Sequence, residues 1–169
     1  ETHPTSMSAV PRFWEKVYIA VKEKMDEANP MQRKLFNHAL KIGRKYNIEY
    51  LSRGKRPPLA LKMEYAALNK SVLSLVRKQL GLEHPNIFPT AGATVSPEVE
   101  EFVHSIGIFM IVGYGLTESL ATVSCDIKGM PYTIGSVGRP LDGVDIKIGD
   151  NNEILLKGPT ITKGYFHRD

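Results

Sequence analysis

The 169-residue chain is 42% hydrophobic and 24% charged, with a formal net charge of +4. This composition can bury a core and is not that of a disordered chain. No apolar run approaches the ~20 residues needed to cross a bilayer, and residues 1–4 do not have the pattern of a signal peptide. The single cysteine, Cys125, excludes an internal disulfide and a cysteine-based zinc site, which favours a cytoplasmic location.

The charge is divided unevenly along the chain. Residues 1–81 hold 16 Lys and Arg against 7 Asp and Glu, whereas residues 82–169 hold 6 against 11. A basic half can contact nucleic acid, an anionic membrane or the phosphates of a cofactor, but dispersed lysines are also typical of solvated helix surfaces. Because these cations are not clustered, we favour the second interpretation and expect no nucleic-acid partner. Peripheral contact with a membrane is left open.

The basic half has a helical pattern in three stretches. The first follows Pro11, the second follows the capping pair Asn29 and Pro30, and the third ends at Gly81. The apolar stripes are, in order, Phe13, Val17, Val21 and Met25; Leu35, Ala39, Ile42 and Tyr46; and Tyr65, Leu68, Val72, Leu75 and Val76. We therefore expect three helices, with a loop at 52–58 between the second and the third.

The spacing of the apolar residues changes in the segment after Gly81. Residues 86–89 predict a short strand that leads into a small-residue loop, and Ser96 and Pro97 predict the cap and first residue of a helix. The buried face of that helix is expected to hold Val99, Phe102, Val103 and Ile106. The apolar run 108–112 is typical of a strand buried on both faces, as in a parallel sheet. Ligands of such sheets bind outside the carboxyl ends of the strands, so residues 113–119 are expected to form a loop at a ligand site.

The last third of the chain alternates apolar and polar residues. Residues 144–148 and 153–157 flank the polar turn 149–152, which predicts an antiparallel hairpin. This change of pattern indicates a second, all-β unit that begins near residue 134. The histidines show no metal-ligand spacing, and His104 is predicted on the polar side of its helix. Cys125 is expected to be an inert buried thiol.

The sequence Gly-Tyr-Gly-Leu-Thr-Glu at 113–118 groups three useful side chains. The two glycines let the backbone bend and present the face of Tyr114, which could stack on a base. Thr117 offers a hydroxyl to a phosphate oxygen, and Glu118 offers the hard oxygen ligand that Mg²⁺ prefers. The alternative is a surface turn with a packed tyrosine.

The stretch 113–118 resembles the nucleotide-binding signature of the adenylate-forming superfamily, and three further segments agree in order. Residues 5–17 resemble the Val-Pro-Arg segment of long-chain acyl-CoA synthetases, and residues 91–98 resemble their small-residue loop. Residues 135–140, with 153–165, resemble the segment that opens their β-barrel subdomain. On this resemblance the chain is identified as an internal fragment of a long-chain fatty acid–CoA ligase.

The resemblance also implies the fold. We expect an α/β protein, with a mostly parallel sheet and flanking helices, plus the start of a β-barrel-like subdomain. Residues 1–133 would be part of the large N-terminal α/β adenylation domain, and residues 134–169 would begin the β-barrel-like subdomain.

The resemblance further implies a role for each matched residue. Tyr114 would stack on adenine, Thr117 would bond the α-phosphate, and Glu118 would hold Mg²⁺; the last two are the predicted catalytic residues. The nucleotide-binding set is Gly92, Ala93, Gly113, Tyr114, Gly115, Leu116 and Thr117. Trp14, Gly115 and Leu116 would border the acyl chain.

The implied reaction has two steps. A fatty carboxylate attacks the α-phosphorus of ATP, with Mg²⁺ as cofactor, and pyrophosphate leaves; the thiol of coenzyme A, the co-substrate, then displaces AMP. The family's triphosphate loop and its C-terminal lysine are expected outside these residues, so the isolated fragment is expected to be inactive. Unpaired sheet edges are expected to make it self-associate.

Several alternatives stay open at this point. Within the superfamily, an aryl-CoA ligase or a luciferase-like enzyme would have the same signature. From other classes, a basic module that binds nucleic acid or membrane, or a purely structural module with this fold, is weighed against the ligase.

Overall fold

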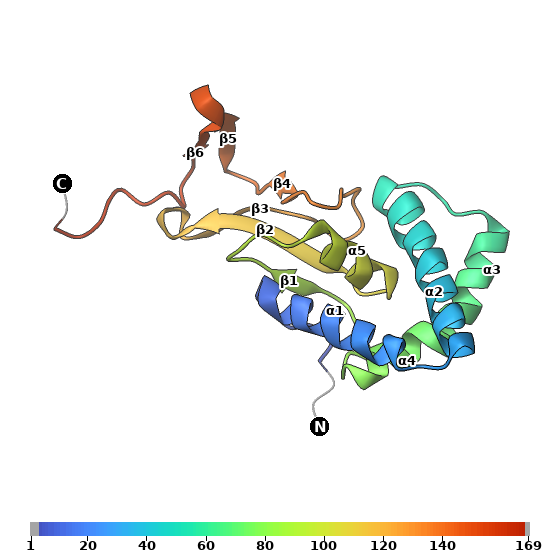
Figure 1. The fold of residues 1–169 in the computed structure, drawn as a ribbon. Coiled ribbons are helices and arrows are strands. Elements are labelled where there is room, and N and C mark those ends of the chain that lie inside the picture. Colours follow the sequence, from blue (N-terminus) through green and yellow to red (C-terminus); the bar gives the residue numbers. More distant parts are fainter. Residues whose placement is uncertain (1–3, 168–169) are drawn as a thin grey trace.

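The computed structural model describes residues 4–167, so the opening residues 1–3 and the final residues 168–169 lie outside it. A four-stranded sheet in the order β1-β2-β3-β4 forms its centre. Helices α1 and α5 lie against the sheet, α2, α3 and α4 gather at one end, and the β5–β6 hairpin projects at the other (Figure 1). None of the described helices combines the length and the apolar character that a membrane crossing requires.

Helix α1 (Pro11–Asp26) begins at a proline that suits the first helical position, as predicted. Its buried face holds Trp14, Val17 and Val21, whereas Phe13 is exposed. The predicted stripe was wrong at this residue because a strict four-residue spacing runs ahead of the 3.6-residue turn. Trp14 lies three residues before Val17 and so shares its face.

Helix α2 (Pro30–Arg44) is capped as predicted, because the side chain of Asn29 accepts a hydrogen bond from the backbone N–H of Gln32. The helix continues into a π-helical turn at Lys45–Tyr50 and a 3₁₀ turn at Leu51–Arg53. Leu35, predicted to be buried, is exposed, and Phe36 is buried in its place.

The third predicted helix forms, but as two α-helices whose buried faces are rotated relative to each other. Helix α3 (Leu59–Leu68) and helix α4 (Ser74–Gln79) are joined by a π-helical turn at Asn69–Leu73. A π-helical turn inserts an extra residue into the helical repeat and so rotates the side chains of the next helix about its axis. Leu73 is therefore fully buried, whereas the predicted core residue Leu75 is exposed.

The predicted strand–helix–strand unit is confirmed. Strand β1 (Phe88–Thr90) pairs in parallel with β2 (Met110–Leu116), with Phe88 opposite Met110, and α5 (Pro97–Ser105) connects them. The four residues predicted for the buried face of α5 are all buried. Ser96 occupies the predicted cap position and Pro97 the first helical position, but the Ser96 side chain makes no capping hydrogen bond.

The sheet is mixed, which confirms the α/β class but corrects the expectation of a mostly parallel sheet. Strand β2 pairs antiparallel with β3 (Ala121–Cys125), and β3 pairs antiparallel with the short β4 (Arg139–Pro140). The stretch predicted as a loop from residue 113 stays extended through Leu116. A 3₁₀ turn at Thr117–Ser119 then reverses the chain, which brings the next strand back beside β2.

Strand β5 (Asp145–Ile148) and strand β6 (Ile154–Lys157) form the predicted hairpin around a turn at Asp150–Asn152. The hairpin is a separate two-stranded sheet. A domain boundary at 133/134 remains a prediction.

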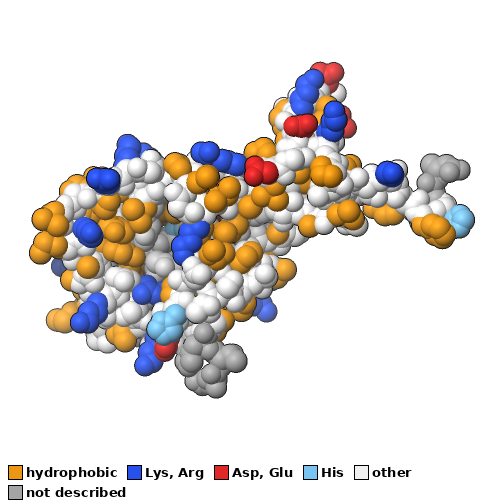
Figure 2. Space-filling model, turned by 180° about the vertical axis from the view of Figure 1, so that it is seen from behind, with side chains coloured by type: hydrophobic (Ala, Val, Ile, Leu, Met, Phe, Trp, Pro, Cys, Tyr) orange, Lys and Arg blue, Asp and Glu red, His pale blue; other side chains and the backbone are white. Residues whose placement is uncertain are grey.

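The two faces of the central sheet differ. Phe88, Met110 and Val112 face α1 and α5 and are buried, and they form one core with Trp14 and Val103. The opposite face lines an open concavity of about 610 Å³ whose apolar side chains include Val10, Ile111 and Leu141. In the view from behind, hydrophobic side chains extend over the middle of the molecule, and lysines and arginines are scattered around them (Figure 2).

Candidate nucleotide site

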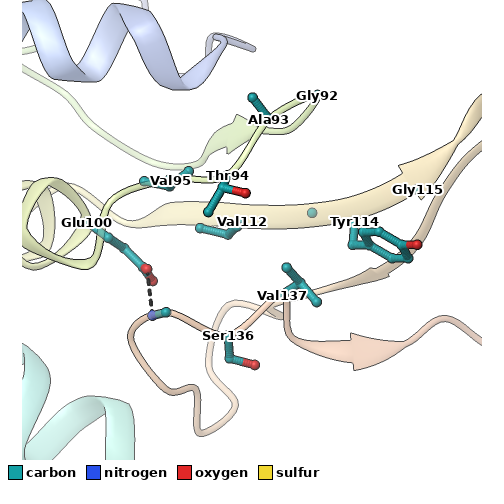
Figure 3. Close-up of a pocket in the computed structure, with 12 residues that line it drawn as sticks. Gly92, Ala93, Thr94, Val95, Glu100, Val112, Tyr114, Gly115, Ser136 and Val137 are labelled. Atoms are coloured by element: carbon teal, nitrogen blue, oxygen red, sulfur yellow. Dashed lines mark hydrogen bonds between the residues drawn. The ribbon is translucent and has the colours of Figure 1, made fainter. Parts of the chain in front are cut away.

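A pocket of about 260 Å³ lies near the carboxyl end of β2, where the strand–helix–strand unit predicts a ligand site. It is formed by the loop after β1, one residue of α5, the middle of β2 and the segment 135–137 (Figure 3). Five predicted nucleotide-binding residues meet there: Gly92, Ala93, Gly113, Tyr114 and Gly115. The structure therefore brings the small-residue loop and the aromatic residue together from segments about 20 residues apart.

Tyr114 lies on the pocket side of β2, on the same face as Val112, because side chains two residues apart share one face of a strand. Its ring is half-buried, with Val137 on the adjoining wall (Figure 3). It is not sunk in the core, and it lines the pocket together with the Gly92–Ala93 loop.

The flanking glycines have a different role from the predicted one. Gly113 and Gly115 do not bend the backbone sharply, because both lie in the strand. A Cβ on Gly115 would collide with the backbone carbonyl of Ala121 on β3. The register between β2 and β3 shifts at Tyr114/Gly115, so this glycine permits a bulge that directs Tyr114.

The loop after β1 also depends on a glycine. Gly92 has φ +92°, a conformation that favours glycine, yet a Cβ there would meet no protein atom within 4 Å. Gly92 therefore faces open space, and this position favours glycine for its backbone conformation and not for lack of room.

Trp14 supports this loop from the core. Its indole N–H donates to Thr90 Oγ1 at 2.8 Å, and its ring packs edge-on against Phe88. The side chain has 0% exposed surface, so it anchors the residue before the loop from within the core. The predicted contact between Trp14 and an acyl chain would need exposed indole surface, and the Trp14 side chain has none in the described structure.

The remaining predicted site residues, Leu116, Thr117 and Glu118, come directly after the pocket-lining part of β2 in the sequence and do not line the pocket. Leu116 is 46% exposed, and Thr117 and Glu118 are exposed in the 3₁₀ turn. The carboxylate of Glu118 accepts a hydrogen bond from the Tyr165 hydroxyl at 2.7 Å, which lowers its pKa. The backbone carbonyl of Glu118 accepts from the N–H of Thr162 at 2.7 Å. Thr117 and Glu118 are thus separated from Tyr114 by the last two residues of β2.

The described residues offer Mg²⁺ little on their own. They contain no group of three or more His, Cys, Asp or Glu side chains placed to hold a metal ion. A single exposed carboxylate fits an ion held mostly by waters and substrate phosphates, which is how Mg²⁺ is usually bound.

Sequence reasoning missed a buried polar cluster beside the pocket. It comprises the buried Glu100 and His104 of α5, the buried Asp126 after β3, and the half-buried Tyr132. Burial raises the pKa of Glu100 to about 7 and that of Asp126 to about 6, and it lowers that of His104 to about 4. The prediction that His104 lies on the polar side of its helix was wrong, because Tyr132 and Phe109 pack against its ring.

The fold is that of the adenylate-forming CoA ligases. o-Succinylbenzoate CoA synthetase from Bacillus subtilis, in complex with an acyl-adenylate intermediate, matches 99% of this chain with a TM-score of 0.52 and 18% identity, over 25% of its own chain. Residues 1–166 match the family described as AMP-binding enzyme. The chain therefore belongs to the AMP-binding enzyme family, which confirms the superfamily predicted from the sequence.

Curated relatives of similar sequence are long-chain enzymes by name. Long chain acyl-CoA synthetase 1 of Arabidopsis thaliana is 29% identical over 184 residues, and the match covers 98% of this chain and 26% of that protein. The long-chain-fatty-acid–CoA ligase ACSBG2 of Rattus norvegicus is 31% identical over 176 residues, and the match covers 100% of this chain and 25% of that protein. The chain thus spans about a quarter of the length of these relatives.

Proposed function

We propose that this chain supplies the adenine-binding wall of an ATP-dependent, AMP-forming ligase that joins long-chain fatty acids to coenzyme A. The observation that carries the proposal is the pocket in which Tyr114 of β2 faces the Gly92–Ala93 loop. The family match supports a nucleotide as ligand, and the names of the curated relatives support a long-chain acyl substrate.

The proposed roles follow the geometry of the pocket. The adenine stacks on Tyr114, and the open space in front of Gly92 admits it. The α-phosphate extends along β2 toward Thr117, whose hydroxyl donates to it. Glu118 then supplies a carboxylate to Mg²⁺, which would stabilise the charge on the phosphates; Tyr165 must release that carboxylate first.

The reaction of the whole protein is proposed on the same basis. A fatty carboxylate attacks the α-phosphorus of ATP, pyrophosphate leaves, and the thiol of coenzyme A displaces AMP from the acyl-adenylate. An aryl acid is the second candidate substrate. The likeness to the Bacillus subtilis enzyme, at 18% identity, supports the shared fold and does not itself favour this substrate. We further propose that residues 134–169, which include the hairpin, belong to a β-barrel-like subdomain, and that the 169 residues alone form no acyl-CoA.

Binding of AMP to the 169-residue chain tests the proposed site directly. We expect titration with AMP, followed by NMR chemical shifts, to perturb the 91–95 loop and β2. Tyr114→Ala should weaken binding about tenfold or more, since base stacking contributes about 1–3 kcal/mol. Tyr114→Phe is the matched control, because it keeps the ring and removes only the hydroxyl.

Two results would contradict the proposal. One is a set of AMP-induced shifts that lies away from this pocket. The other is equal affinity of the wild-type chain and the Tyr114→Ala variant, with the variant still folded.

A further inference from the structure

The helical end of the molecule, which comprises α2, α3, α4 and the turns between them, is strongly basic. Its residues 30–79 hold 12 Lys and Arg against 2 Asp and Glu, whereas the remaining 119 residues hold 10 against 16. Because these helices gather at one end of the sheet, the uneven charge of the sequence becomes an uneven charge in space (Figure 1). The opposite end has no such excess, since residues 139–167, which include the hairpin, hold 4 of each sign.

The two carboxylates of the helical end leave most of these cations unbalanced. Glu64 Oε1 lies 3.0 Å from His38 Nε2, and Glu49 pairs with Arg44. All seven lysines within residues 30–79 are exposed, and in the described part of the chain none of them forms an ion pair. The positive charge of this end is therefore carried mainly by free ammonium groups in contact with solvent.

The same helices expose aliphatic side chains. Met31 of α2 is 81% exposed, and Leu35 of α2 and Leu75 of α4 are also exposed. Leu35 and Leu75 face one open groove of about 480 Å³ between α1, α2 and α4. The aromatic side chains of the helical end, in contrast, are buried or half-buried. In Figure 2, this end lies opposite the projecting hairpin and shows basic side chains set among hydrophobic ones.

Lysines flank the groove on both sides. Lys34 precedes Leu35 on α2, and Lys70 precedes Ser71, which also lines the groove. Lys78 lies one helical turn after Leu75 on α4, so the two side chains are neighbours on one helix face. The aliphatic rim of the groove is thus bordered by ammonium groups on flexible apolar stems.

This combination suits an anionic lipid surface. Anionic headgroups attract Lys and Arg, and the boundary between headgroups and acyl chains accepts Leu and Met. The lysines need not form one compact patch or lose their water, because the attraction to a charged surface extends over about a Debye length, ~8 Å at physiological ionic strength. A single-stranded nucleic acid is bound with exposed aromatic side chains as well as charge, and the helical end does not expose them.

We infer that the helical end, residues 30–79, is a docking surface for an anionic lipid membrane. The lysines contact the headgroups, and the aliphatic rim of the groove, with Leu35 and Leu75, enters the interface. The inference does not depend on the nucleotide site, because the described residues that line that pocket lie outside 30–79.

Flotation of the 169-residue chain with lipid vesicles tests the inference. We expect the chain to float with vesicles that contain phosphatidylserine in phosphatidylcholine, to stay behind with phosphatidylcholine alone, and to be released as the salt concentration rises. Neutralising three lysines at the groove should weaken binding about tenfold or more, because each basic side chain at an anionic surface contributes a factor of about five. The three changes are Lys34→Gln, Lys70→Gln and Lys78→Gln.

A matched control removes the same charge from the opposite end of the molecule and should bind the anionic vesicles as the wild-type chain does. Its changes, at three exposed lysines, are Lys147→Gln, Lys157→Gln and Lys163→Gln. The aliphatic part is tested without any change of charge. Leu35→Gln combined with Leu75→Gln should weaken binding, whereas Ile148→Gln combined with Ile154→Gln, an exposed pair on the hairpin, should not.

Three results would overturn the inference. The first is equal binding to the two kinds of vesicle, and the second is an equal loss in the two triple-lysine variants. The third is tighter binding to duplex DNA than to the anionic vesicles at the same salt concentration, which would assign the basic surface to nucleic acid. Because AMP binding is measured separately, each of these results leaves the proposed function standing.

Discussion

At the scale of single residues, the buried Glu100 should make stability depend on pH. Its pKa is raised from 4.5 to about 7, so the folded protein binds an extra proton between these values and loses stability as the pH rises through them. Glu100→Gln removes this loss, and relative to wild type it should gain up to about 3 kcal/mol in the free energy of unfolding between pH 4 and pH 8. Urea unfolding of both proteins across this range measures the difference. A difference that is constant with pH would show that the carboxylate is solvated.

The sequence identified the site residues whose types have few structural uses. Gly92 and Tyr114 were identified from a small-residue loop and an aromatic residue between glycines, and both line the pocket. Glu100 was missed because a glutamate within an amphipathic helix is normally solvated. Its hydrogen bond comes from Gly135, far along the chain, and no local pattern records that contact.

At the scale of elements, the existence and order of helices and strands were predictable, whereas phase and pairing were not. The hydrophobic pattern predicted α1, α2, α5, β1 and the β5–β6 hairpin. The π-helical turns changed the buried face, and the return of β3 beside β2 turned an expected loop into a strand. The signal for β3 was the apolar–polar alternation from Leu120 to Ser124, which needed a partner strand to be interpreted.

The pairing of β2 with β3 predicts unequal effects of two glycine substitutions. Gly115→Ala should destabilise the chain by about 2–4 kcal/mol, because its Cβ would collide with the Ala121 backbone, which cannot move without breaking the strand pair. Gly113→Ala, on the same strand, should cost less, because its tightest contact would be with the methyl group of Thr122 at 3.3 Å. Thermal unfolding of the two variants makes the comparison. Equal decreases in melting temperature would contradict this prediction, because they would mean that the bulge at Gly115 adjusts to accommodate a Cβ.

At the scale of the whole molecule, the helices cover one face of the sheet and leave the other open. The open face carries Val10, Ile111 and Leu141 around its concavity, and it lies on the side shown in Figure 2. Exposed apolar surface of this kind is typical of a face that contacts more protein. The basic side chains, in contrast, are scattered, as expected of a solvated helical surface.

The open face therefore predicts self-association of the 169-residue chain. We expect the mass measured by size exclusion with light scattering to rise with concentration, and Val10→Lys, on this face, to reduce the rise. Met63→Lys on α3 is the control, because Met63 is also exposed but lies away from the sheet. A monomer at high concentration, or the same effect of both substitutions, would contradict the prediction.

The bond between Trp14 and Thr90 has a practical consequence. The chain has one tryptophan, and it is tied to the residue that precedes the Gly92–Ala93 loop. Its fluorescence emission is thus a native optical signal for that loop, free of any background from a second indole. A shift in emission on adding a nucleotide would report loop movement without a label, and it would do so at concentrations far below those of an NMR titration.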